Sequence, residues 1–457
     1  MRASTAIAGL AFLAIVGSGT YLAGKRVRRT EPARPEIAPE SPLQLARKAL
    51  AAHDFPSATR HLLDARLDPA SADEAWDLLA GIARARQLEC GEDVGKLLEL
   101  FTWTREVGLE AAAWEVAAAV HALDRRNPTA NAWLRLIEYE GEWYEPAQLA
   151  ERIDAASMSG AQKSLEIGRL RERMARLRLQ ALDDPRQARL KFYDDAPFSP
   201  FIIFVEPDPS FDGPIHLETV AQTLGVLREE FSARFGRIVR TPPSGLRCVL
   251  PVCLFPNRKR FLEASGAPVW TASHYDREAG VGFAPTDVKD PNALLFHEGT
   301  HLLVDAAYGL RGGGMALRAG LDAIWVSRGL PCLFEAWRRD ETGWILFTGA
   351  PAEYVRETKA LLDRRGMRTV RDLMSLRTRD YVLVPETEKR ARALEMQSWA
   401  LAYFLWEAGD GRRREQLLAY LDLEWQGKGG PQAAAEAFGN LDVLDAEFRE
   451  FVAQFRD

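Results

Sequence analysis

The sequence is poor in the residue types that build most metal and redox sites. Its 457 residues include only seven histidines and four cysteines, which are Cys90, Cys248, Cys253 and Cys332. No two cysteines have the C-x-x-C spacing of zinc ribbons or thioredoxin-like sites, so the sequence indicates neither class. Cys248 and Cys253 share an apolar run at an odd separation. In a strand they would face opposite sides and could not form a disulfide with each other.

The sequence also lacks an excess of positive charge. Its 59 basic and 65 acidic residues give a net charge of −6. Nucleic-acid-binding domains need a basic surface, so we expect no nucleic-acid partner. The content of 47% hydrophobic and 27% charged residues is typical of globular proteins. The length favours two or three domains.

The N-terminus carries a targeting pattern. Residues 6–24 are apolar or small, and Lys25, Arg26, Arg28 and Arg29 follow. Such a segment predicts that residues 1–24 are a signal peptide or a membrane anchor. The small residues at 17–20 favour cleavage, whereas the basic cluster favours an anchor whose C-terminal side is cytoplasmic. We therefore expect a protein of the cell envelope, membrane-anchored or exported, with the orientation left open.

The next part of the chain reads as helices. A linker with four prolines spans residues 25–42. Residues 43–153 show amphipathic periodicity, with predicted helices at 44–53, 56–65, 72–86 and 109–123. Residues 124–133 resemble the turn and following helix of a tetratricopeptide repeat, so we predict a repeat-like helical domain. Such a domain either binds a protein partner or serves as a spacer. An Arg-rich helical connector is expected at 154–195, with a helix at 161–182.

The pattern changes after this connector. Short apolar, β-rich runs at 201–206 and 246–255 flank a helical pattern at 217–235, and the chain after His297 reads as nearly all helical. We therefore predict an α+β domain at 196–457, with a small mixed sheet and a mostly helical C-terminal half.

The strongest functional signal is the sequence His297-Glu298-Gly299-Thr300-His301. Residues four apart share one helix face, so the two imidazoles can bind one zinc ion while Glu298 takes a proton from water. Asp290 and Pro291 supply a helix start, and Gly309 predicts the helix end. Zinc is the expected cofactor, and a peptide or protein is the expected substrate.

Further segments make the C-terminal half similar to a known family. The run from Trp325 to Glu335, Ser398 to Leu405, and Ala437 to Gly439 all resemble segments of bacterial peptidase-MA-like domains, which are gluzincin-type metallopeptidases. The resemblance spans residues 198–455. It implies a zincin fold, an edge strand at 281–284 that holds substrate, and a third zinc ligand from a glutamate in the Trp325 segment.

The third ligand departs from the family pattern. The family's ligand glutamate corresponds to Arg328, and a guanidinium cannot bind zinc. Glu335 is the predicted third ligand if Pro331 redirects the helix. Asp322 and Cys332 are weaker alternatives.

Two hypotheses follow from this departure. The first is a zinc-dependent peptidase with metal ligands His297, His301 and Glu335 and the general base Glu298. The second is a catalytically degenerate domain that binds a peptide or protein, without zinc and with Arg328 paired to Glu298. Asp305 follows His301 by one turn. It would orient an imidazole in the first case and accept an N–H in a metal-free site in the second.

Overall fold

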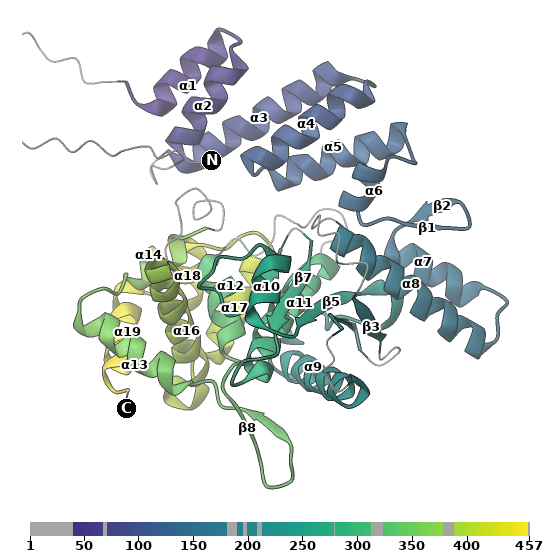
Figure 1. The fold of residues 1–457 in the computed structure, drawn as a ribbon. Coiled ribbons are helices and arrows are strands. Elements are labelled where there is room, and N and C mark those ends of the chain that lie inside the picture. The colour runs from purple at the N-terminus through teal and green to yellow at the C-terminus, as the bar shows by residue number, and fades with distance from the viewer. Residues whose placement is uncertain are drawn as a thin grey trace, which may run out of the picture.

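The computed structural model describes residues 40–66, 71–180, 190–194, 199–207, 213–277, 279–311, 323–377 and 388–455. The expected signal or anchor segment and most of the linker lie outside these ranges, as does Asp322. Within the described ranges, no helix has the length and apolar character needed to cross a membrane. The protein is α+β, with a small mixed sheet, as the sequence predicts (Figure 1).

The N-terminal part is a row of helices that pack on their neighbours in sequence, seen along the top of Figure 1. Side chains at the N-caps fix several starts: Ser41 forms a capping box with Gln44, and Asp54 and Asp93 accept backbone N–H groups. Tetratricopeptide-like repetition stays a prediction. The helices are α1 (Pro42–Ala51), α2 (Phe55–Ala65), α3 (Ala72–Cys90), α4 (Val94–Val107), α5 (Glu110–Leu123) and α6 (Pro128–Trp133).

A β-hairpin interrupts the region that we predicted as wholly helical. Strands β1 (Ile137–Tyr139) and β2 (Glu142–Tyr144) pair antiparallel. The two-residue turn between them needs positive φ at both positions, and Glu140 and Gly141 adopt φ of 51° and 85°. Periodicity missed this hairpin because each strand is only three residues long.

The predicted connector packs on the sheet of the second half. It contains α8 (Gly160–Gln180), and α7 (Pro146–Ala155) precedes it at the end of the predicted helical domain. One face of α8 is buried against the sheet, and Arg171 lies at its centre, fully buried and ion-paired with Asp194. The same guanidinium donates to the carbonyl groups of Gly245 and Ser199. Asp194 lies in β3 (Lys191–Asp194), so the sheet begins inside the segment that we expected to be helical.

The central sheet has five strands in the order β3-β4-β5-β7-β6. The central strands β4 (Phe201–Val205), β5 (Leu250–Phe255) and β7 (Val281–Pro285) run parallel. Strand β3 and β6 (His274–Asp276) pair antiparallel at the two edges. The edge strand expected at 281–284 is therefore an inner strand, paired on both sides, and β6 forms that edge. Strand β6 has only three residues, too few for a periodicity signal.

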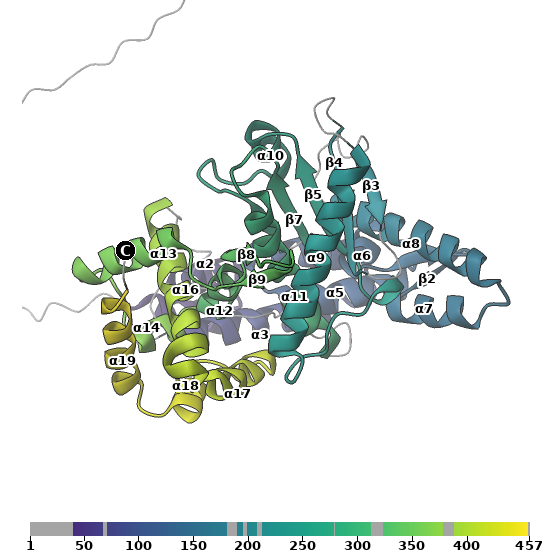
Figure 2. The same ribbon diagram turned by 90° about the horizontal axis from the view of Figure 1, so that it is seen from below.

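Helices cover both faces of this sheet (Figure 2). One face packs against α9 (Gly213–Phe235) and α11 (Pro291–Arg311), and the other against α7, α8 and α10 (Arg258–Ser265). Cys248 belongs to the first of these cores and Cys253 to the second, and all four cysteines are free. The predicted opposite orientation of this cysteine pair is confirmed.

In the described part of the remaining chain, the elements are helices and one hairpin, β8 (Trp337–Arg339) with β9 (Ile345–Phe347), which projects from the body in Figure 1. Buried Trp325, Trp399 and Trp425 join the C-terminal helices to the α9–α11 face in one core. These helices are α12 (Ile324–Cys332), α13 (Ala352–Asp363), α14 (Val370–Ser375), α16 (Glu388–Gly411), α17 (Arg414–Trp425), α18 (Pro431–Phe438) and α19 (Leu441–Ala453).

Candidate metal centre

Helix α11 carries the histidine motif and is positioned by its cap and its neighbours. The Asp290 carboxylate accepts the backbone N–H of Ala293, and Pro291 is the first helical residue, as predicted. Gly299 faces α9 so closely that a Cβ there would lie 2.6 Å from a methyl group of Leu227. The expected end at Gly309 is wrong, because the helix continues to Arg311. A single glycine raises the cost of a helical turn without forbidding it.

The two imidazoles of the motif meet on one side of the helix. Nε2 of His297 and Nε2 of His301 are 3.1 Å apart, and the ring centroids are separated by 4.8 Å. The Glu298 side chain, between them in sequence, is buried. Its Oε2 atom has no hydrogen-bond partner among the described residues. The i, i+4 spacing therefore places the two nitrogens as one metal ion would require.

Glu335 reaches the motif from the segment after α12. The helix ends at Cys332, one residue beyond Pro331, and the chain continues in tight turns in which Phe334 and Glu335 donate to carbonyl groups three residues earlier. Pro331 thus lies in the last helical turn and does not restart a helix. The redirected chain places Oε1 of Glu335 2.5 Å from Nδ1 of His297.

Two donor sets are available to a metal at His297. In one, Nε2 atoms of His297 and His301 face each other. In the other, ligand atoms of His297, Cys332 and Glu335 lie within 4.8 Å of one another. The contact of Glu335 is with Nδ1, the ring nitrogen that does not face His301. A carboxylate in that place typically orients a metal-binding imidazole and makes it a better ligand. Direct ligation by Glu335 stays a prediction.

Further polar groups surround Glu335, and sequence reasoning missed two of them. Tyr354 of α13 donates to Oε2 of Glu335 and, at 3.3 Å, to Glu395 of α16. The Sγ atom of Cys332 is 4.0 Å from Nδ1 of His297 and donates to the Arg328 carbonyl. Glu395 stands three residues before the Ser398–Leu405 segment. Its closeness to this family-like segment is the one sequence feature that pointed to Glu395.

Strand β6 supplies a second set of contacts. Ser273, just before the strand, hydrogen-bonds to Glu298. The ring of Tyr275 stacks on His301, with centroids 5.2 Å apart and planes 7° from parallel. The hydroxyl of Tyr275 donates to Oδ2 of Asp305. Asp305 therefore acts on His301 through Tyr275, and no sequence pattern indicated this tyrosine.

The buried charges shift the titration of the site. Burial alone would lower the pKa of His297, but the charge and hydrogen bond of Glu335 outweigh it and raise that pKa to about 9. Burial raises the pKa of Glu298 to about 7, against the charge of His297 and the Ser273 bond. Burial lowers the pKa of His301 well below its usual value, and the charges of His297 and Arg328 add to this. When no metal is bound, His297 is therefore the imidazole that carries a second proton and a positive charge, and His301 is neutral.

Arg328 is half-buried on α12, and its charge acts on this site. Besides its effect on His301, it opposes the rise in the pKa of Glu395, which is caused first by burial and then by Glu335. The local charge is mixed. Carboxylates of Glu298, Glu335 and Glu395 offset the guanidinium, so a divalent cation would not meet a purely positive environment.

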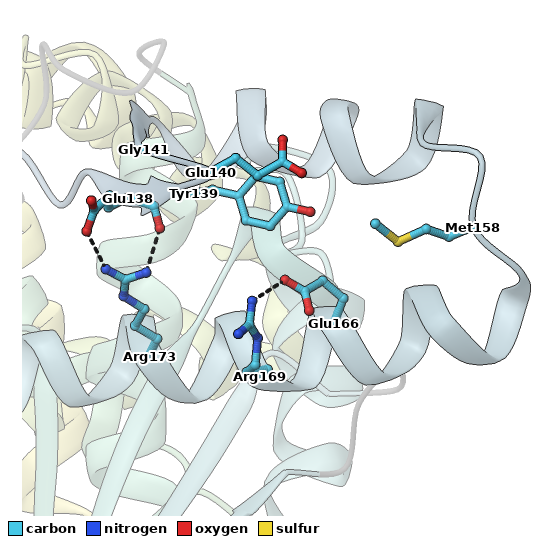
Figure 3. Close-up of a pocket in the computed structure, with 8 residues that line it drawn as sticks. All are labelled: Glu138, Tyr139, Glu140, Gly141, Met158, Glu166, Arg169 and Arg173. Atoms are coloured by element: carbon cyan, nitrogen blue, oxygen red, sulfur yellow. Dashed lines mark hydrogen bonds and ion pairs between the residues drawn. The ribbon is translucent and has the colours of Figure 1, made fainter.

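A separate pocket lies in the helical part and has different chemistry. Figure 3 shows it between the β1–β2 hairpin and α8, where Arg173 pairs with Glu138 and Arg169 pairs with Glu166. These charged side chains are already paired with each other. The pocket wall contains neither histidine nor cysteine, which separates it from the centre on α11.

Comparisons with known proteins add no family to these observations. No family model and no curated protein matches this chain.

Proposed function

We propose that the protein is a zinc-dependent hydrolase of peptide bonds, with His297 and His301 as metal ligands and Glu298 as the general base. The observation that carries this proposal is the 3.1 Å approach of the two Nε2 atoms beside a buried glutamate. The bonds from Glu335 to His297 and from Tyr275 to Asp305 support it, because both hold the motif from outside.

The residues present fit zinc. Two nitrogens bound to one tetrahedral zinc at about 2.0–2.1 Å lie about 3.3 Å apart, close to the separation seen here. Oε2 of Glu298 is a buried polar atom whose hydrogen-bonding capacity is unused among the described residues, as expected of a group that acts on a ligand. Glu335 and Cys332 both lie beside Nδ1 of His297, so either would become the third protein donor only by moving to the Nε2 side or by a metal binding at Nδ1.

Different residues of the chain would act as the general base and as supports for the metal ligands. Zinc, when bound, supplies Lewis-acid activation of water and of the scissile carbonyl group. Glu298 accepts a proton from the attacking water and returns it to the leaving amine. Glu335 fixes the ring of His297 by its bond to Nδ1, and Tyr275 fixes the plane of His301 by stacking. The His297 side chain is 17% exposed, so water can reach the site.

The test combines metal analysis with hydrolysis of a labelled unfolded protein. Purified wild type should hold one zinc per chain. His301→Ala should lose it, and Glu298→Gln should keep the zinc while hydrolysis falls by at least about a hundredfold. His53→Asn, in the exposed turn between α1 and α2, is the matched control and should change neither property. A folded wild type without zinc would overturn the proposal.

The second candidate function is a peptide- or protein-binding domain that does not cut. Arg328 favours it, because this cation stands where the resembling family has a ligand glutamate, and its positive charge lies near enough to His301 to oppose a divalent cation there. A folded, zinc-free protein that retains unfolded polypeptide, with equal retention by Glu298→Gln, would establish this alternative.

The location and partners form a separate part of the proposal. The targeting pattern at residues 6–24 supports the cell envelope, by a signal peptide or an anchor. The row of helices α1–α6 supports a protein partner. Fractionation of cells that express full-length protein and a variant lacking residues 1–30 tests the first point. Equal distribution of both would contradict it.

A further inference from the structure

Edge strand β6 connects three members of the candidate metal centre. Ser273 bonds to Glu298, and Tyr275 both stacks on His301 and donates to Asp305. These contacts come from Ser273, just before the strand, and Tyr275 within it, and among the described residues β6 pairs with β7 alone. The position of β6 therefore sets the surroundings of both the proposed base and one proposed ligand.

The turn that follows β6 is held by the N-terminal half of the chain. Gly280 closes this turn with φ of 66°, and its N–H donates to the Asp276 carbonyl. Two guanidinium groups lie against Gly280. A Cβ there would be 2.7 Å from Nη2 of Arg135 and 3.4 Å from Nη1 of Arg178, and Arg178 also approaches the Gly280 carbonyl at 3.4 Å.

The two arginines come from different elements of the helical half. Arg178 lies on α8, whereas Arg135 lies between α6 and β1. Arg135 has a left-handed backbone, with φ of 56°, which is uncommon for a residue other than glycine. Burial and the charge of Arg178 lower the pKa of Arg135 to about 9, while the charges of Tyr275 and Asp305 oppose that change. An unfavourable backbone and a desolvated charge are thus maintained at this contact.

We propose that Arg135 is a positioning residue through which the N-terminal helical domain holds β6 against α11. The guanidinium packs on the β6–β7 turn, the turn fixes the strand, and the strand fixes Ser273 and Tyr275. A displacement of α6 and the β1–β2 hairpin would release the turn and loosen the surroundings of Glu298 and His301. The helical domain is in this way a structural component of the catalytic domain. The consequence for zinc rests on the proposed function above, whereas the consequence for β6 does not.

The test measures β6 directly, in full-length protein without metal. Arg135→Met keeps the length of the side chain and removes the planar cation, and Arg135→Lys keeps the charge alone. Amide hydrogen exchange at residues 274–283 should be at least about tenfold faster in Arg135→Met, and intermediate in Arg135→Lys. Arg169→Met, which removes an exposed guanidinium paired, among the described residues, only within α8, is the matched control and should exchange as wild type does.

A second measurement concerns the metal. Zinc affinity, from competition with a chelator, should fall about tenfold to a hundredfold in Arg135→Met and stay unchanged in Arg169→Met. Wild-type exchange at residues 274–283 in a folded Arg135→Met protein would overturn the inference. If Arg135→Met does not fold, the same result for Arg135→Lys overturns it. If wild type binds no zinc, the proposed function fails, but faster exchange in Arg135→Met still supports the coupling.

Discussion

The carboxylate of Glu335 contacts His297 at Nδ1, while Nε2 of the same ring faces His301. Glu335 therefore holds the His297 imidazole at Nδ1, and the Nε2 atom of that ring is left to face His301. This arrangement makes Glu335 a support for a metal ligand in the state that the structure describes. For Glu335 to bind the metal itself, it would have to leave Nδ1, or the metal would have to bind at Nδ1 together with Cys332.

The role of Glu335 gives a quantitative prediction. Glu335→Gln keeps the size of the side chain but loses the charge that favours a metal-binding imidazole. Zinc affinity should fall about 10–100-fold, the range found when a supporting carboxylate is removed. Competition with a chelator measures it, and Glu450→Gln, at an exposed site on α19, is the control. Complete loss of zinc would instead identify Glu335 as a ligand.

Cys332 allows the two donor sets to be separated. Cobalt bound at the paired Nε2 atoms should give a spectrum without the thiolate charge-transfer band, because Sγ of Cys332 approaches Nδ1 and not Nε2. Cys332→Ser should then leave the visible spectrum and the affinity unchanged within about twofold. A thiolate band in the wild type that disappears in Cys332→Ser would show that the metal uses the second set.

Much of this centre was readable from the sequence because it is local to α11. The cap at Asp290 and the i, i+4 imidazoles depend on residues within one helix, and both are confirmed. The approach of Glu335 was conditional on a chain break near Pro331, and the chain does leave its helical course there. The helix end at Gly309 was wrong, because one glycine is a weak signal beside continuous packing of the helix.

Contacts from distant segments could not be predicted in this way. Tyr354, Glu395 and Tyr275 come from three other elements, and tertiary packing alone brings them to α11. Periodicity also requires several residues, which β6 and the hairpin strands do not have. Residues 281–284 form an inner strand because β6 pairs antiparallel with the outer side of β7.

Tyr354 should stabilise the fold through the two carboxylates that it bridges. Tyr354→Phe removes a buried donor and leaves Oε2 of Glu335 without that bond, so the free energy of unfolding should decrease by about 1–3 kcal/mol. Urea denaturation measures this change. Tyr403→Phe is the control, because Tyr403 packs on the same Trp399 ring and, among the described residues, bonds to neither carboxylate. Equal effects of both substitutions would contradict the prediction.

Close packing of α12 on α16 depends on Gly329. A Cβ at this position would lie 2.4 Å from the backbone oxygen of Ser398, and backbone cannot move aside as a side chain can. Gly329→Ala should therefore lower the free energy of unfolding by about 1–3 kcal/mol. The control is Gly168→Ala on α8, where a Cβ meets open space and should stabilise the helix by up to about 1 kcal/mol. Thermal unfolding of both variants checks this prediction, and a Gly329→Ala protein as stable as wild type contradicts it.

Removal of zinc should lower stability by a calculable amount if the metal binds only the folded chain. At free zinc about 100 times its dissociation constant, binding adds about 2.7 kcal/mol to the free energy of unfolding. A chelator should therefore lower the melting temperature of the wild type, while His301→Ala should melt at one temperature with or without chelator. The second comparison separates the metal from general effects of the chelator. A wild type whose melting temperature changes with neither zinc nor chelator would contradict the metal site. His297 and His301 would then be a hydrogen-bonded pair on α11, and the Glu335 carboxylate at Nδ1 would offset the positive charge of the His297 imidazole.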